Sequence, residues 1–239
     1  MKRYLEYYEN EWPENIEELT AIDNKPFVGY LNGEGVKYTV VPKPVTGPAD
    51  NEIWYTTVDG NPHDFFNRRE TLENQGMIYS GPELLSNRYD SAKQLYIATF
   101  DDTITGLGLD MDSGASTLSY KYVTVTASNI SKIWLPNKIE SLNYFGISGN
   151  NELTELIIPD TVTHINFGCI YEGNKLYSIS IPSSTLKIEQ NSVVLLPSLG
   201  NIEFRGTIEQ WNNIDKEENW IVECPLATYV QCSDGQVTL

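Results

Sequence analysis

The feature that most constrains this chain is a recurrence of apolar residues every 23 positions. Pro136, Pro159 and Pro182 recur at this spacing, and each ends a short apolar stretch. One further step of the same length reaches residues 202–205, where the register continues without a proline. A fixed period of this length predicts a solenoid, in which each coil buries its apolar side chains by stacking on the coils before and after it.

Several sets of apolar residues recur with this spacing of 23 positions, and we call each set of equivalent positions a column. Within a coil the apolar residues alternate, as in Ile179-Ser180-Ile181, which predicts a very short strand in a parallel ladder. Proline ends such a strand because it has no N–H to donate. The residues that we expect in the solenoid core are Leu135, Leu142, Leu153, Leu156, Ile158, Ile165, Ile170, Leu176, Ile179, Ile181, Ile188, Leu199, Ile202 and Phe204.

The repeat continues upstream in a modified form. Residues 100–107 read like residues 158–165, but the step from there to the next coil is longer than the period. The excess is about a dozen positions, and we expect the insertion within Gly108–Asn129. A weaker coil begins near Gly76, which gives about six coils over residues 76–205.

The stretch from Ile133 to Phe204 resembles the BspA-type leucine-rich repeat family, whose coils follow the pattern I-x-I-P-x-x-V-x-x-I-G-x-x-A-F-x-x-C-x-x-L-x-x-I. The resemblance covers residues 76–239, although the Ala-Phe and Cys positions are mostly replaced here. It implies a fold of the mainly β or α+β class, a leucine-rich-repeat stack with short parallel strands, preceded by a small β-rich N-terminal region.

Residues 206–239 are similar to the end module that often follows such repeats. The last coil of a solenoid has an open apolar face that a cap must cover. We expect Trp211 and Trp220 in the core of this cap, and Asp234-Gly235 predicts a hairpin turn.

Residues 1–75 do not follow the period. Trp12-Pro13 predicts the start of a short helix, Asn32-Gly33 predicts a hairpin, and three prolines within 42–50 predict an extended arm. The stretch 25–60 resembles a leader found ahead of such repeats in proteins of gut bacteria and their tailed phages. An attachment or oligomerisation region would use its aromatic residues. The candidates are Trp12, Phe27, Tyr30, Trp54 and Tyr55, while a capping domain for the first coil is the alternative.

The composition argues against several functions. The 33 acidic and 16 basic residues give a net charge of −17, without the Lys/Arg clusters that nucleic acids and anionic membranes require. Three cysteines without Cys-x-x-Cys spacing indicate neither a disulfide framework nor a zinc site. His63 and His164 are the only histidines, both expected at the surface, and no nucleotide-binding motif occurs. We therefore expect no cofactor, no metal and no enzymatic activity.

These observations predict a structural or adhesive protein. The favoured hypothesis is a phage virion surface component, a head fibre or decoration protein assembled in the host cytoplasm and bound to a capsid protein through residues 1–75. A homo-oligomer, with a trimer preferred, and a glycan or cell-surface ligand on the repeat would be compatible with it. No apolar run of signal-peptide length follows Met1, which favours this hypothesis over the alternative, a bacterial cell-surface adhesin or host-interaction protein.

Overall fold

The structure is a computed structural model, and it describes residues 27–31, 36–40, 47–63, 65, 78–109, 119–126 and 129–239. The chain divides into two compact units, residues 1–47 and residues 48–239. In the first unit, β1 (Phe27–Leu31) and β2 (Val36–Val40) pair antiparallel, with Leu31 opposite Val36. This pairing confirms the predicted hairpin. The predicted helix after Trp12 and most of the proline-rich arm lie outside the described residues.

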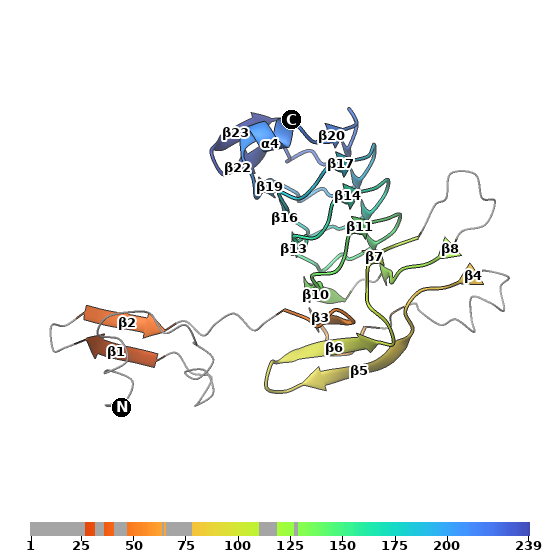
Figure 1. The fold of residues 1–239 in the computed structure, drawn as a ribbon, viewed down its shortest axis with the longest axis vertical. Coiled ribbons are helices and arrows are strands. Elements are labelled where there is room, and N and C mark those ends of the chain that lie inside the picture. Colours follow the sequence, from red (N-terminus) through yellow and green to blue (C-terminus); the bar gives the residue numbers. More distant parts are fainter. Residues whose placement is uncertain are drawn as a thin grey trace. The chain divides into compact units, whose positions relative to one another are not determined.

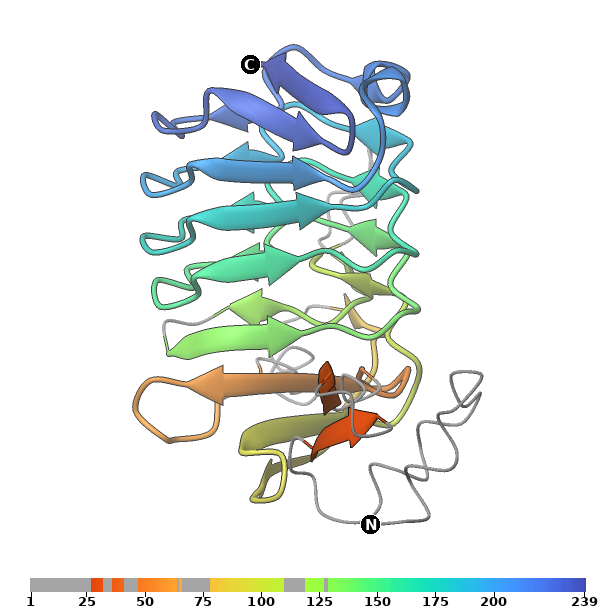
Figure 2. The same cartoon turned by 90° about the vertical axis from the view of Figure 1, so that its left-hand side faces the viewer.

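The second unit is a stack of coils whose short strands form three parallel ladders (Figures 1 and 2). The first ladder contains β13 (Glu155–Ile157), β16 (Ser178–Ile181), β19 (Asn201–Phe204) and β22 (Tyr229–Cys232), and the antiparallel β23 (Gly235–Thr238) ends it. The second contains β7 (Gly106–Leu107), β11 (Ser141–Leu142), β14 (His164–Ile165), β17 (Lys187–Ile188) and β20 (Asp215–Lys216). The third contains β9 (Val125–Thr126), β12 (Ile147–Ser148), β15 (Ile170–Tyr171), β18 (Val193–Val194) and β21 (Ile221–Val222).

The strand register follows the period seen in the sequence. Leu156 lies opposite Ile179, which lies opposite Ile202 on its other side. In the last coil the spacing changes, because Ile188 pairs with Lys216, five positions later than the period would place its partner. The extra residues hold the short helix α4 (Ile208–Asn212), whose N-terminus is closed by a capping box with Thr207 at the N-cap.

The insertion in the upstream coil lies where the sequence predicts it. Leu107 pairs with Leu142, which lies twelve positions later in the sequence than a 23-residue period would place its partner. Val125 pairs with Ile147, which lies one position earlier than the period would place its partner. The additional residues therefore lie between Leu107 and Val125. They include β8 (Ser119–Tyr120), which pairs parallel with β4 (Ile78–Tyr79).

The N-terminal end of the stack differs from the expected domain division. The strand β3 (Glu52–Thr57) lies between β6 (Leu95–Phe100) and β10 (Ile130–Trp134) and pairs antiparallel with both, while β5 (Leu84–Asp90) pairs with the other edge of β6. Residues 48–60 are therefore part of the compact unit that contains the repeat, and the division falls after Gly47 instead of near residue 75. The reason is apolar burial, because β3 contributes side chains to the core of this unit.

All the residues expected in the solenoid core are buried and belong to one continuous apolar cluster. Leu153, Leu176 and Leu199 are 1%, 2% and 0% exposed. Exposure to solvent changes sharply between the neighbours Ile157 and Ile158, which are 65% and 0% exposed. At the C-terminal end Trp211 and Trp220 are also buried, with ring centroids 5.8 Å apart. The described residues include no helix with the length and apolar character required to cross a membrane.

Candidate interaction surface

The residues predicted for attachment are placed differently by the structure. Trp12 lies outside the described residues, and Phe27 and Tyr30 belong to β1. Trp54 and Tyr55, expected as contact residues, are 7% and 0% exposed. Trp54 packs with Leu95 and Ile97 on one face of β3, and Tyr55 stacks on Tyr96 on the other face, 5.4 Å between ring centroids. These two side chains stabilise the sheet and are not accessible to a partner.

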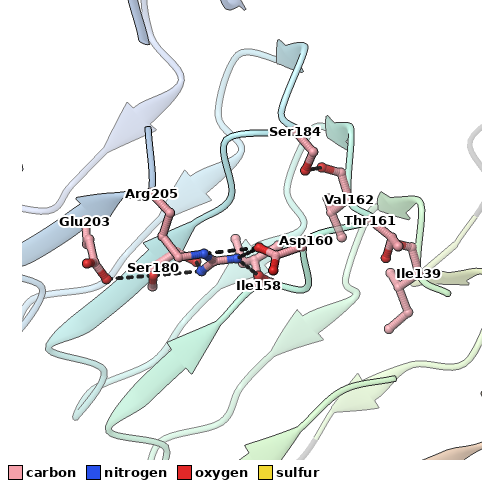
Figure 3. Close-up of polar contacts among 9 residues, drawn as sticks. All are labelled: Ile139, Ile158, Asp160, Thr161, Val162, Ser180, Ser184, Glu203 and Arg205. Atoms are coloured by element: carbon pink, nitrogen blue, oxygen red, sulfur yellow. Dashed lines mark hydrogen bonds and ion pairs between the residues drawn. The ribbon is translucent and has the colours of Figure 1, made fainter. Parts of the chain in front are cut away.

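A polar cluster around Arg205 joins three successive coils (Figure 3). Arg205 occupies the column that holds proline in earlier coils, and its Nη2 donates to the Ile158 carbonyl at 2.5 Å and to Asp160 Oδ1 at 2.7 Å. Its Nη1 donates to the carbonyl and to Oγ of Ser180, and Ser180 Oγ donates to Glu203 Oε2 at 2.8 Å. Because the Ser180 hydroxyl is used both as donor and as acceptor, the cluster holds coils together and does not present a nucleophile.

Hydroxyl groups one coil apart make equivalent contacts beside this cluster (Figure 3). Thr161 Oγ1 donates to the Ile139 carbonyl at 2.7 Å, and Ser184 Oγ donates to the Val162 carbonyl at 2.8 Å. Each bond connects a turn to the coil before it. These bonds fix the turns, so that the surface of the stack is a rigid support.

The two histidines lie in different environments. His164 is exposed as expected and shares a hydrogen bond with Thr163 Oγ1. His63 was expected in solvent but is 4% exposed, because its ring packs 4.6 Å from the ring of Phe65 and 6.3 Å from that of Tyr55.

The three cysteines and the potential metal ligands give no reactive site. Cys169, Cys224 and Cys232 are buried and free, and burial raises the pKa of the Cys169 thiol well above its ordinary range. A thiol with a raised pKa is a poor nucleophile at neutral pH. No group of His, Cys, Asp or Glu side chains that could hold a metal ion occurs within the described ranges.

A pocket of about 460 Å³ opens beside the turn that follows β3. The residues that line it are Thr56, Thr57, Gly60, Tyr89, Gln94, Leu95 and Tyr96. None of these residues is charged at neutral pH, so the pocket offers no acid–base pair for catalysis.

Partly exposed aromatic side chains gather where the second ladder leads into the third, three of them in the turns and one, Tyr171, in β15. We call Tyr144, Phe145, Phe167 and Tyr171 the aromatic patch. The Tyr144 ring lies 3.9 Å from the Phe145 ring and 5.8 Å from the Phe167 ring, centroid to centroid, and is nearly parallel to the latter. The Phe145 ring meets the Tyr171 ring edge-on at 5.7 Å. Phe167 is 37% exposed, and the other three are half-buried. Two successive coils thus form one continuous aromatic surface.

The backbone at this patch is held in an unfavourable conformation. Phe145 has a φ of 54°, and the residues at its position in the next two coils are Gly168, at 59°, and Asn191, at 50°. Glycine and asparagine tolerate this left-handed region, whereas a bulky residue is destabilised there by about 1–2 kcal/mol. Gly168 is also required for space, because a Cβ at this position would lie 2.7 Å from Tyr144 Cδ2. The fold therefore keeps an aromatic residue at a position where the backbone disfavours it.

Carboxylates lie next to the aromatic patch. Glu189 accepts a hydrogen bond from the Phe167 amide at 3.0 Å and pairs with Lys187 at 2.9 Å. The pKa of Tyr171 is raised, chiefly because its hydroxyl donates to the Glu172 carboxylate, and the charge of Glu223 contributes.

The aromatic patch has no periodic signature in the sequence. Its rings do not recur with the period: the position of Tyr144 is filled by Phe167 and then by Gln190, and the position of Phe145 by Gly168 and then by Asn191. A search for periodic aromatic residues cannot detect it. The available signal is the glycine and asparagine in the column of Phe145, which indicate a left-handed backbone position.

The comparison with known proteins concerns the repeat. Residues 121–215 match the family model of the BspA type leucine rich repeat region in six copies. No curated protein and no solved structure matches the chain. The match supports the leucine-rich-repeat identification of this part of the chain, and this is a non-enzymatic repeat family whose presence suggests a role in protein interaction or adhesion.

Proposed function

We propose that this chain is a non-enzymatic binding protein that attaches to a large partner through the aromatic patch. The observation that carries this proposal is Phe145, an aromatic residue in the left-handed region at the centre of a partly exposed aromatic cluster. Unfavourable backbone conformations persist where the surrounding structure enforces them, and they concentrate at binding sites. Aromatic side chains contribute most to binding at interfaces.

The stack of coils that carries the aromatic patch favours a large partner. The coils are connected by three ladders and by the side-chain bonds of Arg205, Thr161 and Ser184, so the aromatic rings are presented with little freedom to move. Such preorganisation lowers the entropic cost of binding. A repeat stack offers a wide surface instead of an enclosed cavity, which favours binding of a macromolecule over turnover of a small substrate.

The more specific proposal is a virion surface component, a head fibre or decoration protein. Its support is the resemblance of residues 25–60 to a leader found in proteins of gut bacteria and their tailed phages. Because Trp54 and Tyr55 are buried in the unit that contains the repeat, attachment to a capsid would be a task of residues 1–47. A bacterial surface adhesin is the alternative. Capsid and portal genes beside this gene would support the virion proposal, and a cluster of surface-export genes would overturn it.

The binding role of the aromatic patch is tested by comparing the binding of the full-length chain and of its Phe167→Ala variant to intact bacterial cells. Tyr177→Ala is the matched control, because Tyr177 is an aromatic residue that is 46% exposed and lies outside the patch. We expect Phe167→Ala to weaken binding to the cells at least tenfold, and Tyr177→Ala to leave it unchanged. Equal binding of all three proteins to the cells would overturn the proposal.

A further inference from the structure

The surroundings of the aromatic patch indicate the chemistry of its partner. Glu172 follows Tyr171 directly, and both Glu172 and Glu223 are exposed. The two glutamates occupy the same turn position, two coils apart, with φ values of 55° and 56°. Glu189 lies beside Phe167, and its neighbour Lys187 is paired with it. The charged groups that face the patch are therefore predominantly carboxylates.

Elsewhere the molecule places its own cations over aromatic rings. Lys216 Nζ lies 4.8 Å from the Trp211 ring centroid, Lys121 Nζ 5.1 Å from that of Tyr122, and Lys93 Nζ 5.4 Å from that of Trp54. Within the part of the chain that the structure describes, no cation lies over a ring of the aromatic patch. Its rings are thus open to a cation from another molecule, and such a contact contributes about 0.5–1 kcal/mol at an exposed site.

We propose that the aromatic patch, with Glu172, Glu189 and Glu223 around it, binds an arginine- or lysine-bearing segment of a protein partner. The cationic side chain would lie over the exposed ring face of Phe167 or Tyr171, and its charge would be matched by the flanking carboxylates. Arginine is favoured over lysine, because its planar guanidinium both stacks on a ring and donates to a carboxylate. The net charge of −17 would also attract a basic partner over distance and repel an acidic one.

This inference depends on the proposed binding function, and it adds the chemical class of the partner. An anionic lipid surface is disfavoured by the same carboxylates. A neutral glycan could stack on the rings but would gain nothing from Glu172 and Glu223. The contribution of the carboxylates therefore separates a cationic protein segment from a glycan.

The experiment titrates a short peptide, with two arginines separated by glycine, into the full-length chain. Binding is measured by calorimetry at two salt concentrations. The same peptide with citrulline in place of arginine keeps the shape and removes the charge. We expect binding of the arginine peptide to be weakened at least fivefold by Phe167→Ala and by the double variant Glu172→Gln/Glu223→Gln. The citrulline peptide should bind at least fivefold more weakly than the arginine peptide.

Two controls separate the patch from the general acidity of the chain. Tyr177→Ala removes an exposed aromatic residue elsewhere, and Glu209→Gln/Glu218→Gln makes the same change of net charge outside the patch. Both should bind the arginine peptide within twofold of the wild type. Equal weakening by the patch and control variants, or stronger binding of a neutral oligosaccharide than of the arginine peptide, would overturn the inference. If Phe167→Ala loses binding to cells but keeps binding to the arginine peptide, the inference fails and the binding function stands.

Discussion

Arg205 Nη2 lies 2.7 Å from Asp160 Oδ1, although the two residues are almost two full coils apart in the sequence. The arginine spans two coil boundaries, because its guanidinium also binds the carbonyls of Ile158 and Ser180. In the preceding coils this column holds proline, which ends a strand and offers no such bonds. The chain therefore replaces a residue that ends strands with one that links coils close to the C-terminal cap.

We predict that Arg205→Ala lowers the free energy of unfolding by about 1.5–3 kcal/mol, the range for hydrogen bonds to a charged group. Most of this loss comes from the two backbone carbonyls, because the Asp160 side chain is 84% exposed and a solvated ion pair contributes little. Urea denaturation measures the effect. Arg88→Ala, at an exposed position of β5, is the control and should change stability by less than about 0.5 kcal/mol. Equal stability of both variants would show that the contacts of Arg205 are not important.

Tyr55 gives a prediction for alkaline pH. Burial raises its pKa from about 10 to about 12, although its hydroxyl oxygen accepts a hydrogen bond from the His63 amide at 3.0 Å, which favours the ionised form. Between pH 10 and pH 12 the Tyr55 hydroxyl is ionised in the unfolded chain but still protonated in the folded chain. The stabilisation that this group contributes is therefore complete below pH 10 and is lost as the pH rises toward 12. The loss amounts to about 2 kcal/mol.

The measurement for Tyr55 compares unfolding of the wild type and Tyr55→Phe from pH 9 to pH 12. The phenylalanine variant has no group to ionise at this position. The stability advantage of the wild type should therefore shrink by about 2 kcal/mol over this range. An advantage that stays constant across the range would contradict the burial of Tyr55 described here.

Much of the repeat could be predicted from the sequence because its cause is local and periodic. A residue such as Leu153 is apolar for the same reason as Leu176, since each packs against the equivalent residue of the neighbouring coil. The hairpin of the cap is also predicted from Asp234-Gly235, but the structure places its turn one residue earlier, at Ser233 and Asp234, because Gly235 already pairs with Cys232.

The parts that could not be predicted depend on contacts between segments that share no period. The strand β3 enters the sheet from outside the repeat, and nothing in its local pattern distinguishes an exposed Trp54 from one packed on Leu95 and Ile97. His63 follows a turn-forming Asn61-Pro62 pair, but it is enclosed by the rings of Tyr55 and Phe65. In each case packing between distant residues overrides the local preference for the surface.

Phe145 gives a prediction in which glycine is the more stabilising replacement. Phe145→Gly and Phe145→Ala both remove the ring, but only glycine adopts the left-handed conformation without strain. Phe145→Gly should therefore be about 1 kcal/mol more stable than Phe145→Ala, and both should bind the partner more weakly than the wild type. Thermal unfolding of the two variants tests the first part. A more stable alanine variant would mean that the turn does not impose this backbone conformation.

The coils stack in register, so that Ile158 points into the core and its neighbour Ile157 points into solvent. The most direct measurement is the free energy of unfolding of Ile158→Asp beside that of Ile157→Asp, at positions that are 0% and 65% exposed. Burying an unpaired charge should cost Ile158→Asp more than about 3 kcal/mol. Ile157→Asp should lose less than about 1 kcal/mol, the span of strand preferences. Similar losses in both variants, or a larger loss in Ile157→Asp, would contradict the stacking register.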